Sequence, residues 1–219
     1  MKTSLATIIA VCLSSFFGYS QMTNLGRMEG ARVNTKPSAD VPPNGSPYYD
    51  QTLRTVMVSG SATLVRHNSH TDQIEYLVGE ETWVLTPQKN VLIPTSDKKY
   101  IYVYTDYAFG NKAEEGYLLL VKDLPNVKLY SKQRVTLSKE VISNGYTAYK
   151  PATYEKLPTK YLIKIKDNPI VQLTAKKKDL VKLFPGKEKE ISAYLKNEKN
   201  LDENDRDMTK LAEFLNTLI

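Results

Sequence analysis

The chain has 219 residues, a formal net charge of +6 and one cysteine, Cys12. A single cysteine excludes a disulfide-stapled scaffold and a cysteine-based zinc site. The 30 basic residues are spread along the chain among 24 acidic ones, which is typical of a solvated surface and argues against a nucleic-acid partner. About 200 residues can bury a core without disulfides.

The first twenty residues are predicted to be an export signal. Lys2 supplies a positive start, and the apolar stretch 5–17 is too short to span a bilayer as a helix. Small residues just before Gln21 predict cleavage at that position, which removes Cys12 with the signal. Lipidation of Cys12 is the alternative, but the bulky Val11 before it argues against this. We therefore expect a periplasmic or extracellular protein whose mature chain has no transmembrane segment.

Two further regions come next in chain order. Residues 21–45 are rich in Gly, Pro and Asn and are predicted to be a flexible arm. Residues 46–174 are predicted to be an antiparallel β domain of about ten short strands, because β-branched and aromatic residues alternate between turn signals. The clearest alternation is "KKYIYVYTDY", and "GYLLLVKDLPNVKLYSK" and "KYLIKIKDNPIVQLT" are predicted hairpins. The stretch from Val135 to Pro158 breaks this pattern and is predicted to be a long surface strap, which is either functional or packed across a barrel mouth.

After Thr174 the hydrophobic period changes from two to about 3.6 residues. Three apolar stripes follow, separated by Pro185-Gly186 and by a polar stretch, and they predict three short helices over residues 175–219. Thr174 is the expected N-cap of the first helix, and Asp202 or Asp205 that of the last. The predicted fold class is α+β: a curved antiparallel sheet, as a sandwich or an open barrel, followed by a C-terminal helical cap docked on it.

The only candidate cluster of metal ligands is "LVRHNSHTDQIEYL", which holds both histidines. His67 and His70 are three residues apart, whereas a helical zinc site needs a spacing of four. The surrounding residues are turn formers between two β-like runs, and the mature chain is expected to have no cysteine and no further histidine to complete a site. We therefore expect a hairpin with its tip near residues 68–72, no bound metal and no cofactor.

A resemblance supports this interpretation. "GSPYYD", "VRHNSHTDQIEY" and "KKKDLVKLFPGKEKEISAYLKNEKNL" together resemble a family of small exported proteins of Bacteroidetes-type bacteria whose function is unknown. The resemblance runs from about Gly45 to the C-terminus and consists of a packing pattern, with no catalytic signature. Where this chain has His67 and His70, that family usually has aromatic residues. The resemblance therefore implies ring packing for both histidines and transfers no catalytic residue.

No catalytic residue can be named from the sequence. "VSGSA" lacks the strand–GxSxG–helix context of a serine nucleophile, and the phosphate-binding loops GxxxxGK and GxGxxG are absent. A glycosidase needs only two suitably spaced carboxylates, and any β protein with acidic turns offers such candidates. Here they are Asp72, Glu75, Glu80, Glu81, Asp106, Glu114 and Glu115.

Tyrosine is the most distinctive residue type, with 15 Tyr against 5 Phe and 1 Trp. Tyr100, Tyr102 and Tyr104 share one face of a predicted strand and could stack on a sugar ring or a peptide; the alternative is that they cover half-exposed sheet. The favoured function is a non-enzymatic exported envelope or binding protein, with a glycan, a peptide or an envelope protein as candidate partner. The alternatives are an enzyme acting on envelope polysaccharide through a carboxylate pair and a carrier of an apolar ligand.

Overall fold

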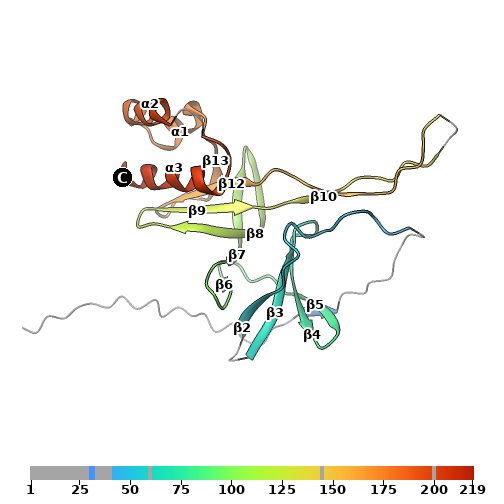
Figure 1. The fold of residues 1–219 in the computed structure, drawn as a ribbon. Helices are drawn as coiled ribbons and strands as arrows, with labels where there is room; N and C mark the ends of the chain where they lie inside the picture. The colour runs from blue at the N-terminus through green and yellow to red at the C-terminus, as the bar shows by residue number, and fades with distance from the viewer. Residues whose placement is uncertain (1–29, 33–40, 59–60, 144–145, 199–200) are drawn as a thin grey trace, which may run out of the picture.

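The computed structural model describes residues 30–32, 41–58, 61–143, 146–198 and 201–219. The predicted export signal and most of the predicted arm therefore lie outside the described residues. Within the described part there are thirteen strands and three helices (Figure 1). The strands are β1 (Gly30–Arg32), β2 (Arg54–Val58), β3 (Ser61–Asn68), β4 (Gln73–Val78), β5 (Glu81–Leu85), β6 (Leu92–Pro94), β7 (Ile101–Phe109), β8 (Lys112–Asp123), β9 (Val127–Lys132), β10 (Val135–Leu137), β11 (Tyr154–Lys156), β12 (Lys160–Ile165) and β13 (Val171–Leu173), and the helices are α1 (Lys177–Leu183), α2 (Glu188–Asn197) and α3 (Asp205–Thr217).

A closed five-stranded barrel forms the centre of the molecule. Strands β7, β8, β9, β12 and β13 are antiparallel neighbours in chain order, and β13 pairs back onto β7 through Val171 and Ala108. An odd number of alternating strands brings the first and last strands side by side in parallel, so this closing pair is parallel. The barrel interior is filled by side chains that alternate inward: Val103, Tyr107, Leu118, Tyr130, Leu162 and Ile170.

A second sheet packs on the outside of the barrel. Its strand order is β1-β5-β4-β3-β2, and a bridge between Val56 and Thr95 joins it to β6. The inward residues of this sheet meet the outward residues of β6, β7 and β8. Together they form a second core of Val56, Val65, Ile74, Tyr76, Leu85, Ile93, Tyr102 and Tyr117.

The three helices cover another outer face of the barrel (Figure 1). Buried residues of β9, β12 and β13 pack against Leu180, Phe184, Ile191, Met208, Leu211, Ala212 and Leu215 of the helical cap. The expected helix caps were wrong in detail. Lys176 is the N-cap of α1 without a side-chain bond, while Asn204 caps α3 by accepting the Asp207 N–H at 2.9 Å. Thr174 instead donates its hydroxyl to Asp179 at 2.9 Å.

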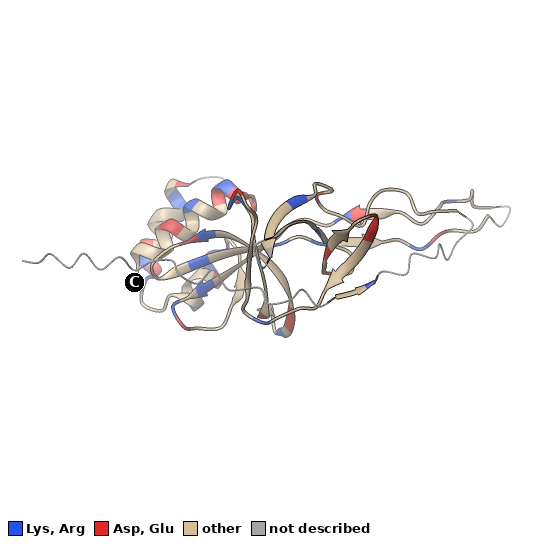
Figure 2. Cartoon of the chain, turned by 90° about the horizontal axis from the view of Figure 1, so that it is seen from below, with Lys and Arg blue, Asp and Glu red and all other residues tan. Residues whose placement is uncertain are grey.

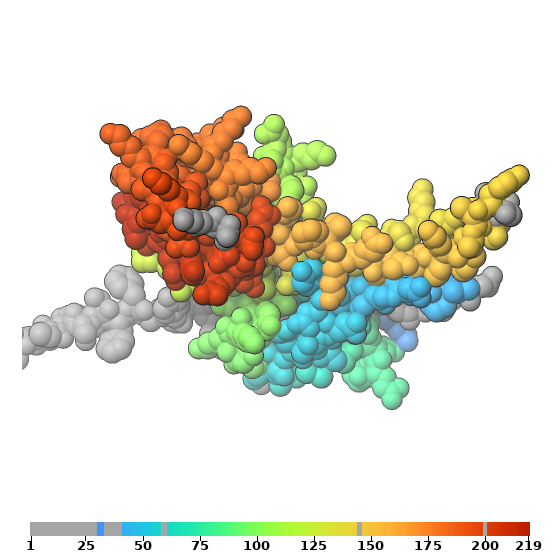
Figure 3. Space-filling model, turned by 45° about the horizontal axis from the view of Figure 1, so that its top comes forward, coloured from blue at the N-terminus to red at the C-terminus, as the bar shows by residue number. Residues whose placement is uncertain are grey.

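The segment predicted as a strap is a ribbon that projects away from the body. Strands β10 and β11 pair at its base, and Val141 pairs with Lys150 further out. Asn44 forms an isolated parallel bridge with Thr153. Figure 3 shows this ribbon in yellow and orange, with the blue segment that follows residue 41 along its base. The ribbon therefore does not close a barrel mouth.

The predicted α+β class, with a curved antiparallel sheet followed by a helical cap, is confirmed. The predicted arm contributes β1, which pairs with β5. Among the described residues, no helix is long and apolar enough to cross a membrane. Figure 2 shows basic and acidic residues interleaved along strands and helices.

Candidate functional site

The hairpin predicted around the two histidines is confirmed: β3 and β4 are joined by a turn at residues 69–72. Asn68 closes this turn by accepting the backbone N–H groups of His70 at 3.1 Å and Thr71 at 3.2 Å. Asp72 completes it with a positive φ of 56°, a conformation that Asn and Asp adopt more readily than most residues. The turn thereby directs the Asp72 side chain toward the barrel.

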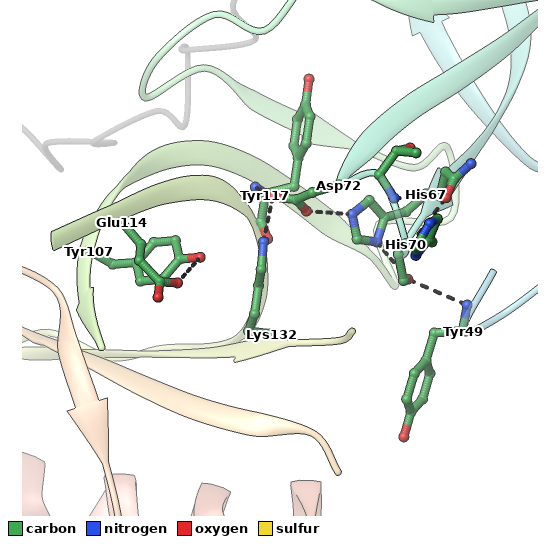
Figure 4. Close-up of polar contacts among 11 residues, drawn as sticks. Tyr49, His67, His70, Asp72, Tyr107, Glu114, Tyr117 and Lys132 are labelled. Atoms are coloured by element: carbon green, nitrogen blue, oxygen red, sulfur yellow. Dashed lines mark hydrogen bonds and ion pairs between the residues drawn. The ribbon is translucent and has the colours of Figure 1, made fainter. Parts of the chain in front are cut away.

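Asp72 is the centre of a polar cluster between the second sheet and the barrel (Figure 4). Its Oδ1 lies 2.9 Å from His67 Nε2, and its Oδ2 accepts Lys132 Nζ at 2.6 Å and the Tyr117 N–H at 3.1 Å. Lys132 also donates to the Tyr117 carbonyl at 3.0 Å. The cluster therefore joins the β3–β4 turn to β8 and β9.

Burial and charge act in opposite directions on this pair. Burial alone raises the pKa of Asp72, but the hydrogen bond from His67 and the charge of Lys132 outweigh it and lower the pKa below its usual value. Burial lowers the pKa of Lys132, and the Asp72 carboxylate only partly offsets this effect. We infer that the two groups form an ion pair at neutral pH, and that burial opposes the charge of Lys132 more than the charge of Asp72.

The two histidines do not converge on a common point. The His67 ring packs between Tyr102 and Tyr117, with centroid distances of 5.8 and 6.0 Å. The His70 ring packs on Tyr154 at 5.3 Å, and its Nδ1 lies 3.3 Å from the Val135 carbonyl. Both rings thus pack on tyrosines. Among the described residues there is no group of three His, Cys, Asp or Glu side chains that could hold a metal.

Ser69, His67 and Asp72 form a chain of contacts in the order used by serine hydrolases. Ser69 Oγ lies 3.2 Å from His67 Nδ1. However, Ser69 is only 5% exposed, and its Oγ also accepts the Tyr49 N–H at 3.4 Å. An acyl substrate cannot reach this hydroxyl without disrupting the turn. The arrangement therefore holds His67 in place and does not form a hydrolase triad.

Six of the seven carboxylates considered as candidate pairs have structural partners, Asp72 among them. Glu75 is buried and accepts from Tyr48 at 2.7 Å, Asn68 at 2.8 Å and Arg66 at 3.0 Å. The remaining contacts are between Glu81 and Arg32, between Glu114 and Tyr107, and from Asp106 and Glu115 to the same lysine, Lys89. These six carboxylates are thus engaged in contacts that hold the fold together.

Two open pockets lie next to this cluster, and we call them together the tyrosine groove. The first, of about 450 Å³, is lined by Tyr49, Asp50, Gln51, Tyr100, Tyr102, Leu119, Gln133, Lys156 and Asp205. The second, of about 550 Å³, shares Asp50 and Tyr100 with the first and continues past Arg54, Ser96, Asp97 and Lys99. Two of the three tyrosines predicted for stacking, Tyr100 and Tyr102, therefore line this groove. Tyr104 instead packs edge-on against Tyr117, with centroids 5.1 Å apart.

The polar residues of the groove are held in fixed positions. Arg54 binds Asp50 at 2.5 Å and lies over the Tyr100 ring at 3.7 Å from its centroid. Burial raises the pKa of Asp50, but hydrogen bonds with Arg54 and the Thr52 N–H outweigh burial and hold it at about 2. Asp205 accepts the Tyr161 hydroxyl at 2.7 Å. The groove thus presents oriented side chains before any ligand arrives.

The sequence did not indicate most of these groove residues. Tyr49 and Gln51 precede β2, Gln133 follows β9, and Asp205 begins α3. No local spacing connects such distant segments. The one available signal was the alternation in β7, which placed Tyr100 and Tyr102 on the same face.

The buried tyrosines lead to a prediction for alkaline pH. Burial raises the pKa of Tyr102 and of Tyr130 to about 12, and it raises the pKa of six more: Tyr48, Tyr104, Tyr107, Tyr117, Tyr161 and Tyr194. In the unfolded chain tyrosine ionises near pH 10. A folded pKa above the unfolded value means that this stabilisation is complete below about pH 10 and is lost as the pH rises toward 12.

Tyrosinate absorbance, followed against pH in the folded and the denaturant-unfolded protein, checks this prediction. We expect the unfolded protein to titrate in one step near pH 10. The folded protein should show a later group of tyrosines that ionises as the circular dichroism of the fold disappears. Identical curves in the two states would contradict the burial of these rings.

Comparison of this chain with known protein families, curated proteins and solved structures finds no match.

Proposed function

We propose that this chain is an exported, non-enzymatic binding protein and that an envelope glycan lies along the tyrosine groove. The observation that carries the proposal is the meeting of Tyr49, Tyr100 and Tyr102 with two glutamines and three aspartates in adjoining pockets. Export rests on the predicted signal at residues 1–20, which points to the periplasm or the extracellular space.

A glycan fits the chemistry of this groove. Sugar rings have flat apolar faces that pack on aromatic rings, and tyrosine adds a hydroxyl for hydrogen bonding. The Gln51 and Gln133 amides can donate and accept, and the Asp50 carboxylate accepts only, so together they match ligand hydroxyl groups. A groove extending over two open pockets suits a chain better than one small molecule.

The structure gives less support to a carrier of an apolar ligand. The barrel interior is occupied by packed side chains, including Tyr107, Leu118 and Leu162. A carrier needs an internal cavity with a mouth, and the ribbon that could have covered such a mouth points away from the body.

An enzyme is also less well supported. Asp50 and Asp205 both line the groove, but a glycosidase needs a general acid with a raised pKa. Arg54 keeps Asp50 ionised, and Asp205 is engaged by Tyr161. Asp50 therefore does not supply the protonated carboxyl group that glycosidic-bond cleavage requires.

An oligosaccharide array followed by calorimetric titration of the strongest binder tests the proposal. We expect Tyr100→Ala and Gln133→Ala each to weaken binding tenfold or more, which is about 1.4 kcal/mol. Tyr149→Ala is the matched control, because this tyrosine is 45% exposed on the ribbon and lies outside the groove. It should leave the affinity unchanged.

The contrary results are equally specific. Hydrolysis of the bound oligosaccharide would favour the enzyme. Binding of a fatty acid or another apolar probe, without any oligosaccharide binding, would favour the carrier. Equal loss of affinity in Tyr149→Ala would move the site to the ribbon.

A further inference from the structure

The contact between Asp72 and Lys132 is unusually close for a lysine with so little exposure to water. The Lys132 side chain is 6% exposed, and its Nζ lies 2.6 Å from Asp72 Oδ2. Gly116 makes this approach possible, since a Cβ at that position would lie 2.0 Å from Asp72 Oδ2 and 2.8 Å from Lys132 Nζ. The absence of a side chain at Gly116 therefore allows the amine to lie directly against the carboxyl group.

Both oxygens of the carboxyl group have hydrogen-bond donors. His67 Nε2 lies 2.9 Å from Oδ1, and the Tyr117 N–H donates to Oδ2 at 3.1 Å. Such donors stabilise the negative charge that develops on oxygen when a nucleophile attacks the carboxyl carbon. Burial of Lys132 favours the neutral amine, which is the nucleophilic form. Fixed proximity adds an entropic advantage over a reaction in solution.

We propose that Lys132 Nζ and Asp72 Cγ form an intramolecular amide and release one water. The ammonium first passes one proton across the direct contact to Oδ2, and the neutral amine then attacks Cγ, forming the new C–N bond. The hydrogen bond from His67 Nε2 stabilises the negative charge on Oδ1 of the tetrahedral intermediate. The nitrogen then passes its second proton to Oδ2, which leaves Cγ as water while the C=O bond re-forms at Oδ1. An ammonium and a carboxylate become one amide, and the net charge is unchanged.

The position of this bond gives it a mechanical role. It connects the β3–β4 turn with β9, sixty positions further along the chain, and so joins the second sheet to the barrel. With Cys12 as the only cysteine, the chain cannot form an internal disulfide. An amide crosslink performs the same task, because it restricts the unfolded chain by closing a long loop. The inference does not depend on what the tyrosine groove binds.

Mass spectrometry of the mature protein tests the crosslink directly. We expect an intact mass about 18 Da, one water, below that of the linear chain. Trypsin should yield a branched peptide in which residues 67–89 are joined to residues 129–134, uncut after Lys132. The branched peptide separates this bond from two other losses, a succinimide at an aspartate and cyclisation of an N-terminal Gln21.

Variants identify the reacting groups. Lys132→Arg and Asp72→Ala should lack the branched peptide, and His67→Phe, which keeps a ring but removes the donor to Oδ1, should reduce its yield at least tenfold. Lys128→Arg is the control, because this lysine lies on the same strand in an exposed ion pair with Asp123. It should keep the full yield. Wild-type protein at its linear mass, with the two tryptic segments recovered separately, overturns the proposal even if every variant misfolds.

Discussion

Gly116→Ala is expected to lower the free energy of unfolding by about 3–5 kcal/mol, the cost of breaking a buried charge pair. The added Cβ would lie only 2.0 Å from Asp72 Oδ2, so the carboxyl group must move. Moving it separates Asp72 from Lys132 and from His67, both of which are buried. A displaced carboxyl group can neither pair nor react with Lys132, so the variant keeps a lysine charge without a counterion in a place that water does not easily reach.

The control lies in the same hairpin. Gly110 in the β7–β8 turn has a positive φ of 61°, but an added Cβ there meets nothing within 4 Å. Gly110→Ala should therefore cost only the backbone strain, about 1 kcal/mol. Urea denaturation of both variants measures the difference. Equal losses of stability would show that close approach at Gly116 does not matter.

The sequence was sufficient for the class of fold because its strongest signals are local. Alternation in "KKYIYVYTDY" requires Tyr102 and Val103 to face opposite sides, and the structure places them in different cores. The connections inside predicted hairpins are equally local. Closure of the barrel is different, because it depends on one pairing between Ala108 and Val171, more than sixty residues apart. Neither the composition nor the hydrophobic periodicity of the sequence predicts such a contact.

The candidate site was predicted only in part, for the same reason. The turn at residues 69–72 and the shared face of Tyr100 and Tyr102 follow from short-range pattern. The partners of Asp72 do not, since Lys132 and the Tyr117 N–H come from strands with their own hydrophobic pattern. A lysine in a β run is ordinarily expected at the surface, and only tertiary structure shows that this one is buried.

The helical cap should unfold together with the β domain, and Phe184→Ala is the variant that shows it. Phe184 is buried in a core that also includes Leu129 and Ile163 of the barrel strands. Removing the ring is expected to cost about 3–5 kcal/mol, because the surrounding side chains cannot fill the space. Helices as short as α1 gain little stability in isolation, so they depend on this contact with the sheet.

A thermal scan by calorimetry should therefore show one transition in the wild type and one in Phe184→Ala, with Tm lower by roughly 10 °C. Lys178→Ala changes an exposed residue of the same helix and should leave Tm nearly unchanged. If the wild type shows two transitions and Phe184→Ala shifts only the smaller, residues 175–219 form an independent module. In that case the core shared by the helices and the barrel contributes little to stability. Asp205, which begins α3, would then move with the helical cap relative to the other residues of the tyrosine groove.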